Sequence, residues 1–288
     1  MPLPLILLPL LAQVGPMVSP GAAPPINLPT GAERPAKPRQ RTARAAPARL
    51  AEPGPLQTCL TDTEPQHALD LGDAWLASAK GPAQTQAQLC RGSALTRLER
   101  WSDAQAAFLA GRDAAAGTDH TARATLGAMA GNAALAANAP APALAALDVA
   151  HRDAVAANDA ALAGAIALDR ARALVALKRE PEAATALAEA RTGVPDNPEA
   201  WLLSATLARR QNKLAEAQQY IEKAAQLMPV DPEIGLEAGV IAELAGHEAA
   251  ARKSWQSVVA AAPESEQAKT ARGYLAQIGA APAAPKAR

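Results

Sequence analysis

The side chains that act as metal ligands or nucleophiles are few in this sequence and lie far apart. Its two cysteines, Cys59 and Cys90, do not form a C-x-x-C pair. No histidine lies at a zinc-ligand spacing from either cysteine, and the sequence has no HExxH motif. We therefore expect no metal site and no redox catalysis. The four histidines are His67, His120, His151 and His247.

One group of titratable residues has the composition of an acid-base site. Asp148, His151 and Asp153 follow one another closely on a predicted helix. Neighbours two or three positions apart on a polar helix face are typical of solvated surface, and no GxSxG motif or P-loop accompanies them. The sequence therefore predicts a protein that is not an enzyme and needs no cofactor.

The two cysteines suit a covalent link within the chain. An even number of cysteines behind an exported N-terminus indicates a disulfide formed in an oxidising compartment. A bond between Cys59 and Cys90 would close a loop of about 30 residues and stabilise the fold by roughly 3 to 4 kcal/mol in the chain-entropy model. It would fasten a predicted helix near residues 65–80 to the helices that follow. The alternative is a pair of buried thiols.

The N-terminus has the pattern of an export signal. Residues 1–14 form an apolar run of signal-peptide length that is too short to span a membrane. We assign 1–23 to a signal peptide and 24–55 to a disordered linker rich in Pro, Ala and Arg. This interpretation places the mature chain in the periplasm or outside a bacterial cell, without a stable membrane span. Because no Lys or Arg precedes the apolar run, an unprocessed cytoplasmic chain is the alternative.

Charge is balanced overall but unevenly distributed. Lys plus Arg equals Asp plus Glu at 28 each, so no net field favours nucleic acid or an anionic membrane. The residues before position 56 carry six basic and two acidic side chains, a net charge of +4, which leaves −4 for the rest. We interpret the basic segment as a solvated spacer, with contact to anionic lipid or an acidic partner as the alternative. Its cations are Arg34, Lys37, Arg39, Arg41, Arg44 and Arg49.

The composition favours helices that pack through small side chains. Of the 288 residues, 49% are apolar but only 2% are aromatic. Alanine dominates the apolar residues, and it is the best intrinsic helix former, whereas the residues that favour strands are scarce. The sequence therefore predicts an all-α fold.

A period of 34 residues organises the C-terminal half. Pro195, Pro229 and Pro263 are spaced 34 residues apart, and such a fixed period indicates a solenoid. Clear repeats cover 164–197, 198–231 and 232–265, and degenerate ones cover 85–118 and 124–157, with insertions near 118–123 and 158–163. Small residues recur at the eighth and twentieth positions and larger apolar residues at the twenty-fourth. We expect the packing contacts and helix ends at Ala205, Ala217, Ile221, Ala224, Pro229, Gly239, Ala251, Trp255 and Pro263.

This pattern resembles the tetratricopeptide-repeat (TPR) family, whose repeat has 34 residues. The resemblance covers residues 85–278. It implies an all-α, right-handed solenoid of TPR-like helical hairpins with capping helices. The solenoid would span 56–278, ending in a capping helix near 265–278, and a disordered tail would follow at 279–288.

The resemblance also implies a concave groove, lined by the first helix of each repeat, that binds a protein or peptide. Arginines there would suit an acidic segment or a C-terminal carboxylate. We predict a non-enzymatic scaffold or adaptor of the bacterial envelope. The alternatives are a chaperone-like holdase for exported proteins and an accessory subunit of an envelope enzyme complex. The polar residues expected in the groove are Ser93, Arg97, Asn132, Arg172, Arg209 and Arg210.

Overall fold

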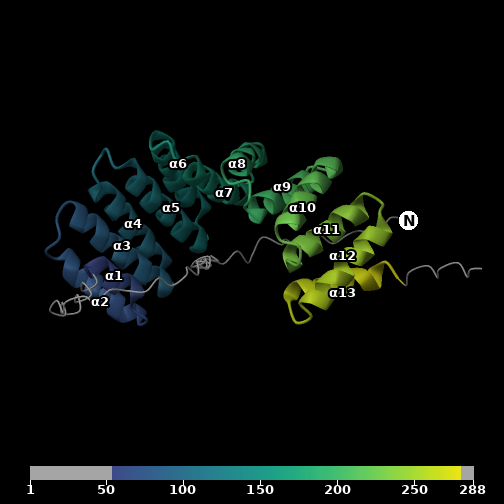
Figure 1. Ribbon diagram of the computed structural model, residues 1–288, viewed down its shortest axis with the longest axis horizontal. Coiled ribbons are helices and arrows are strands. Elements are labelled where there is room, and N and C mark those ends of the chain that lie inside the picture. The colour runs from purple at the N-terminus through teal and green to yellow at the C-terminus, as the bar shows by residue number, and fades with distance from the viewer. Residues whose placement is uncertain (1–53, 280–288) are drawn as a thin grey trace, which may run out of the picture.

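A computed structural model describes residues 54–279, so the predicted signal peptide, nearly all of the linker and the predicted C-terminal tail lie outside the described residues. This part of the chain contains thirteen helices and no strand, which confirms the predicted all-α solenoid. The helices follow one another along an elongated stack (Figure 1). They are α1 (Pro55–Thr61), α2 (Pro65–Leu76), α3 (Pro82–Arg97), α4 (Trp101–Ala114), α5 (His120–Ala136), α6 (Pro140–Ala156), α7 (Ala160–Ala176), α8 (Glu180–Gly193), α9 (Pro198–Arg210), α10 (Leu214–Leu227), α11 (Pro232–Leu244), α12 (Glu248–Ala261) and α13 (Glu266–Gln277).

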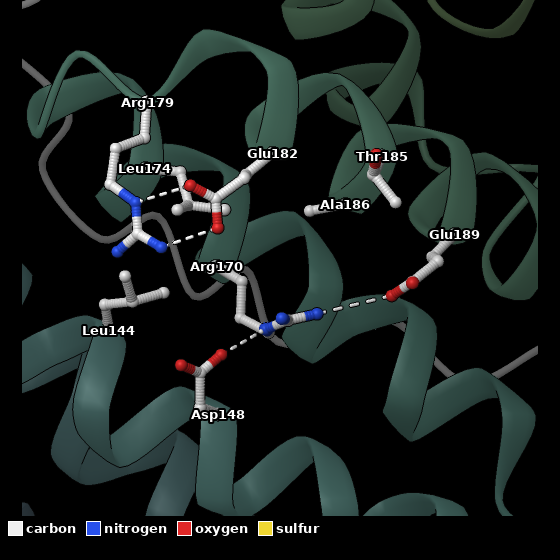
Figure 2. A pocket seen from close by; sticks show the side chains of 9 residues that line it. All are labelled: Leu144, Asp148, Arg170, Leu174, Arg179, Glu182, Thr185, Ala186 and Glu189. Atoms are coloured by element: carbon white, nitrogen blue, oxygen red, sulfur yellow. Dashed lines mark hydrogen bonds and ion pairs between the residues drawn. The ribbon is translucent and has the colours of Figure 1, made fainter.

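Helices α3 to α12 form five hairpins that stack with equivalent helices on the same side. We call α3, α5, α7, α9 and α11 the A helices, and α4, α6, α8, α10 and α12 the B helices. Neighbouring A helices touch across the stack, as α5 does with α7 and α9 with α11. On the other side, a cleft of about 190 Å³ separates α6 from α8 (Figure 2), and one of about 340 Å³ separates α4 from α6. The stack therefore curves toward the A helices, whose exposed surface we call the concave face.

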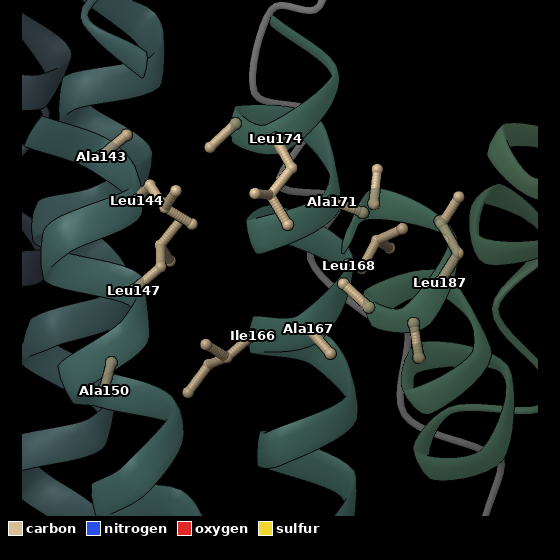
Figure 3. Close-up of a cluster of buried hydrophobic side chains, with 14 of the residues drawn as sticks. Ala143, Leu144, Leu147, Ala150, Ile166, Ala167, Leu168, Ala171, Leu174 and Leu187 are labelled. Carbon is tan, nitrogen blue, oxygen red and sulfur yellow. The ribbon is translucent and has the colours of Figure 1, made fainter. Parts of the chain in front are cut away.

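Each hairpin is held together by a small residue facing a large one. At the eighth position Gly92, Gly131 and Gly239 lie so close to a side chain of the B helix that a β-carbon would overlap it. That side chain belongs to the twenty-fourth position, and it is Phe108, Leu147 or Trp255 respectively. Alanine replaces glycine in the other two hairpins, opposite Leu187 and Ile221. Figure 3 shows the apolar side chains of α6, α7 and α8, including Ala171 and Leu187, which form the centre of the largest buried cluster.

The turn inside every hairpin has a left-handed residue at the same place, the fifteenth position of the repeat. The following N–H donates to the carbonyl oxygen five residues back, as from Arg179 to Leu174 at 2.8 Å. This bond satisfies a carbonyl that the helix end leaves free. Only one of the five residues is a glycine, for which this conformation carries no steric cost. They are Glu99 (φ 56°), Asn138 (54°), Lys178 (60°), Asn212 (59°) and Gly246 (78°).

The extra residues of the first hairpins lengthen helices instead of forming loops. The sequence placed insertions near 118–123 and 158–163, yet α5 already begins at His120 and α7 at Ala160. The side chains of Asp119 and Asp159 accept hydrogen bonds from the first turns of these helices and fix the earlier starts. Helices α5, α6 and α7 therefore have 17 residues each, against 13 or 14 in the last two hairpins.

The N-terminal end of the stack is closed by α1 and α2. Cys59 of α1 and Cys90 of α3 form the disulfide that the sequence predicts, and both cysteines are buried. The guanidinium of Arg97 donates to the carbonyl oxygens of Asp62 and Thr63, both at 2.6 Å. The short helix α1 is thus tied to the first hairpin by one covalent bond and two hydrogen bonds.

Replacing Lys178 by glycine should stabilise the protein by about 0.5–1 kcal/mol, because relief of the left-handed conformation exceeds the extra entropy that glycine loses on folding. Urea unfolding followed by circular dichroism measures the change. The reciprocal variant Gly246→Ala should lose about 1 kcal/mol. A Lys178→Gly variant less stable than the parent would contradict this account of the turn.

Gly131→Ala should destabilise the protein by about 1–3 kcal/mol, since the added methyl group overlaps Leu147. Gly273→Ala in α13 is the matched control. Its β-carbon would meet no atom within 4 Å, so the higher helix propensity of alanine should raise stability by about 0.5–1 kcal/mol. Both midpoints can be measured in the same urea titration, and a loss of equal size in the two variants would rule out hairpin packing as the cause.

Candidate partner-binding surface

The six predicted groove residues lie on A helices, and no partner is present to test their role. The four arginines among them all bind groups of this chain. Arg97 binds the carbonyls before α2, as described above, and Arg210 reaches Glu180 at the start of α8, with 2.7 Å between Nη2 and Oε1. Arg172 and Arg209 join neighbouring A helices. The groove that was expected to be basic therefore has its cations neutralised by the fold.

A polar network crosses the concave face from α5 to α9. Asn132 of α5 hydrogen-bonds Asp169 of α7, which pairs with Arg172 of the same helix. The Nε of Arg172 also donates to the Glu199 carboxylate of α9, at 3.1 Å from Oε1. Burial raises the pKa of Asp169, against the opposing effect of Arg172. The network joins three successive hairpins through side chains, in addition to their apolar contacts.

A second ion pair continues this connection to α11. The Nε atom of Arg209 lies 2.6 Å from Oε1 of Glu237, and each side chain is only 11% exposed. Partial burial strengthens the attraction between the two charges. It also means that removing one of them would leave the other partly buried and unpaired, which destabilises the fold. Arg209 is thus a link between the last two hairpins.

Carboxylates on this face were missed by the analysis of the sequence. Asp169 and Glu237 occupy the sixth position of their repeats, which was not among the positions expected to line the groove. Glu199 and Glu233 occupy the second position, which was among them, but only Ser, Asn and Arg side chains were named there. Loss of hydration, followed by the negative charges of Asp231, Glu199 and Glu237, raises the pKa of Glu233.

The cleft on the B side is lined by ion pairs. In Figure 2, Arg170 of α7 lies between Asp148 of α6 and Glu189 of α8, with its Nε 2.8 Å from Asp148 Oδ1 and its Nη1 3.3 Å from Glu189 Oε2. At its rim, Arg179 holds Glu182. These charges satisfy one another and join three helices, so the cleft resembles a structural seam more than a ligand pocket.

Asp148 and His151, which the sequence places close together, both belong to the charge cluster around Arg170, whereas Asp153 has separate surroundings. His151 lies 3.3 Å from Glu189, and burial together with Arg170 lowers its pKa. Asp153 instead pairs with Arg112 at 3.0 Å and with Arg123, which lower its pKa although burial opposes ionisation. Within residues 54–279 no cluster of three or more His, Cys, Asp or Glu side chains could hold a metal ion. Over the same range, no helix has the length and apolar character needed to cross a bilayer.

The fold is shared with solved structures of repeat proteins. PilW, described as a widely conserved type IV pilus biogenesis factor, matches with a TM-score of 0.61 and 20% identity over 75% of this chain and 94% of PilW. BtubC from P. vanneervenii matches at 0.56 with 13% identity, over 79% of this chain and 97% of BtubC. YrrB, described as a TPR protein with an unusual peptide-binding site, matches at 0.50 with 16% identity, over 65% of this chain and 91% of YrrB.

These likenesses concern three-dimensional structure alone. No protein-family model matches the sequence, and no curated protein matches it either. The chain has the fold of the TPR proteins, as its 34-residue pattern predicts.

Replacing Arg209 by leucine should destabilise the protein by about 3 kcal/mol, because Glu237 then keeps a partly buried charge without a partner. The double variant Arg209→Leu/Glu237→Leu should recover most of this loss. Arg179→Leu is the control, since its pair with Glu182 is 46% and 55% exposed and should contribute less than about 1 kcal/mol. Urea unfolding of the parent and the three variants measures these changes, and equal losses at Arg209 and Arg179 would contradict the prediction.

Proposed function

We propose that this protein is a non-enzymatic scaffold that binds a partner protein or peptide on its concave face. The observation that supports this most directly is the A-helix surface itself, which α3, α5, α7, α9 and α11 form across five hairpins and which combines charged with apolar side chains. A repeat stack of this kind offers a long surface for an extended ligand. The ion pairs of Arg172 with Glu199 and of Arg209 with Glu237 join successive hairpins, which is a structural role.

We further propose that the scaffold works in the envelope of a bacterium, after export. The disulfide between Cys59 and Cys90 supports this location, since such bonds persist in the periplasm and are rare in the cytosol. The apolar run at residues 1–14 supports it independently. The predicted groove set from Ser93 to Arg210 belongs to the same proposal, with its arginines positioning the A helices that a partner would contact.

The partner-binding face can be tested by obstructing it with side chains that leave the inter-hairpin bridges intact. Ala165 occupies the same repeat position as Glu199, and Thr206 the same position as Arg172, each in the neighbouring repeat. Both therefore lie along the same face. The variant Ala165→Arg/Thr206→Arg adds bulk there, and Ala188→Arg/Thr192→Arg adds the same charge on exposed positions of α8. Partners of the tagged chain would be recovered after cross-linking in intact cells and identified by mass spectrometry.

We expect a partner from the envelope fraction with the parent and the α8 variant, and at least about tenfold less of it with the concave-face variant. Recovery that is equal for both variants would contradict binding on the concave face. A broad, unselective set of exported proteins would support the holdase alternative. Partners drawn from the cytosol alone would contradict the proposed location.

A further inference from the structure

The C-terminal half of the concave face carries more carboxylates than cations. Two arginines, Arg172 and Arg209, face five acidic side chains on α7, α9 and α11. Of the cations at its margins, Arg210 pairs with Glu180 and Lys269 with Glu266, whereas Arg272 of α13 donates to the carbonyl oxygen of Pro263. On α7, α9 and α11 the face has an excess of three negative charges. The five acidic residues are Asp169, Glu199, Glu233, Glu237 and Glu243.

Two of these carboxylates have no cation within the described residues. Glu233 has only acidic groups as charged neighbours, namely Asp231, Glu199 and Glu237. The Oε2 atom of Glu243 is buried and finds no hydrogen-bond partner in residues 54–279. A buried carboxylate oxygen without a partner is costly, and natural structures rarely keep one. Of the two, Glu233 is exposed and accessible to a cationic group from outside the described residues, whereas one oxygen of Glu243 is shielded from solvent.

The sequence contains a segment with the opposite character. Residues 34–49 include six basic side chains and no acidic one, a net charge of +6. Prolines at positions 35, 38 and 47 favour an extended backbone, which suits a long surface better than a helix does. We propose that residues 34–44 of this chain bind the acidic half of its own concave face and thereby cover the surface that takes the partner.

The connecting chain is long enough for this. Residue 44 precedes Gly54 by ten residues and residue 34 by twenty, which reach at most about 35 and 70 Å at roughly 3.5 Å per residue. Packed helices lie about 8–10 Å apart, so the four steps from α3 to α11 span about 40 Å. Residue 34 can therefore reach α11, and residue 44 can reach α9, which is three steps or about 30 Å away, while α1 stays fastened by its disulfide.

This inference rests on the proposed function in one respect, since covering the concave face matters only if a partner binds there. The segment and the partner would then compete. Because exposed charges attract weakly at high ionic strength, the covered state should open as salt is added. A partner able to displace the segment needs its own positive charge or contacts with the apolar side chains of the A helices.

A labelled peptide with the sequence of residues 33–49 provides the test. It would be titrated, by fluorescence anisotropy, with the full chain and with a variant whose own segment is neutralised, Arg34→Gln/Arg39→Gln/Arg41→Gln/Arg44→Gln. We expect the neutralised chain to bind the peptide at least about tenfold more tightly than the parent, whose face is occupied. Raising salt from about 0.05 to 0.5 M should weaken this binding strongly.

Charge reversals identify the face. In the neutralised chain, Glu233→Lys/Glu243→Lys should weaken peptide binding by about tenfold or more. Glu216→Lys/Glu222→Lys, at exposed positions of α10, makes the same change in net charge on a B helix and should leave it nearly unchanged. Circular dichroism and thermal unfolding establish that both variants are folded.

Peptide binding that is equal for the parent and the neutralised chain would overturn the proposal, as would equal losses in the two charge-reversal variants. Its failure is distinguishable from failure of the scaffold function, because the peptide titration needs no partner and the cross-linking experiment needs no peptide. If the partner is lost from the Ala165→Arg/Thr206→Arg variant and the peptide does not bind, the scaffold function is supported and the covered face is ruled out.

Discussion

Close approach between the two helices of each hairpin is the constraint on which the rest of this structure depends. With 2% aromatic residues the chain cannot fill wide gaps, so its helices must come near enough for alanine to make contact. Glycine or alanine at the eighth position permits that approach, and one larger side chain at the twenty-fourth fills what remains. A single hairpin made in this way still exposes an apolar side, which only the next hairpin covers.

Stacking of small residues leaves polar side chains to link the hairpins on the inner side. Arg172 and Arg209 extend from one A helix to a carboxylate of the next. Such partly buried pairs contribute less to net stability than their short distances suggest, because both charges are desolvated. Their clearer effect is on register, since a hairpin shifted along its neighbour would leave several charges unpaired. The same pairs remove the free cations from the concave face.

Much of the fold was predictable from the sequence, and the charge of the concave face was not. The spaced prolines and the eighth and twenty-fourth positions report contacts inside one hairpin, where two helices lie close in sequence. The ion pairs that neutralise the arginines of this face lie between hairpins. Which side chains meet there depends on how far each hairpin is rotated relative to the next. Asp169 and Glu237, at the sixth position, become part of the face through that rotation. The pattern of residues within one repeat contains no information about the rotation between hairpins.

Helix lengths, like the contacts inside one hairpin, depend on residues that are close in sequence. The longer α5 and α7 could have been recognised, because Asp119 and Asp159 are good N-caps placed before alanine-rich runs. Extra helical turns keep the hairpins packed where inserted loops would have separated them. The consequence for function is a continuous A-helix surface from the disulfide-fastened N-terminal cap to α13. If this face binds a partner as proposed, its neutralised arginines and surplus carboxylates would favour cationic over anionic ligands. The most basic segment of the sequence precedes the end of the stack that the disulfide holds.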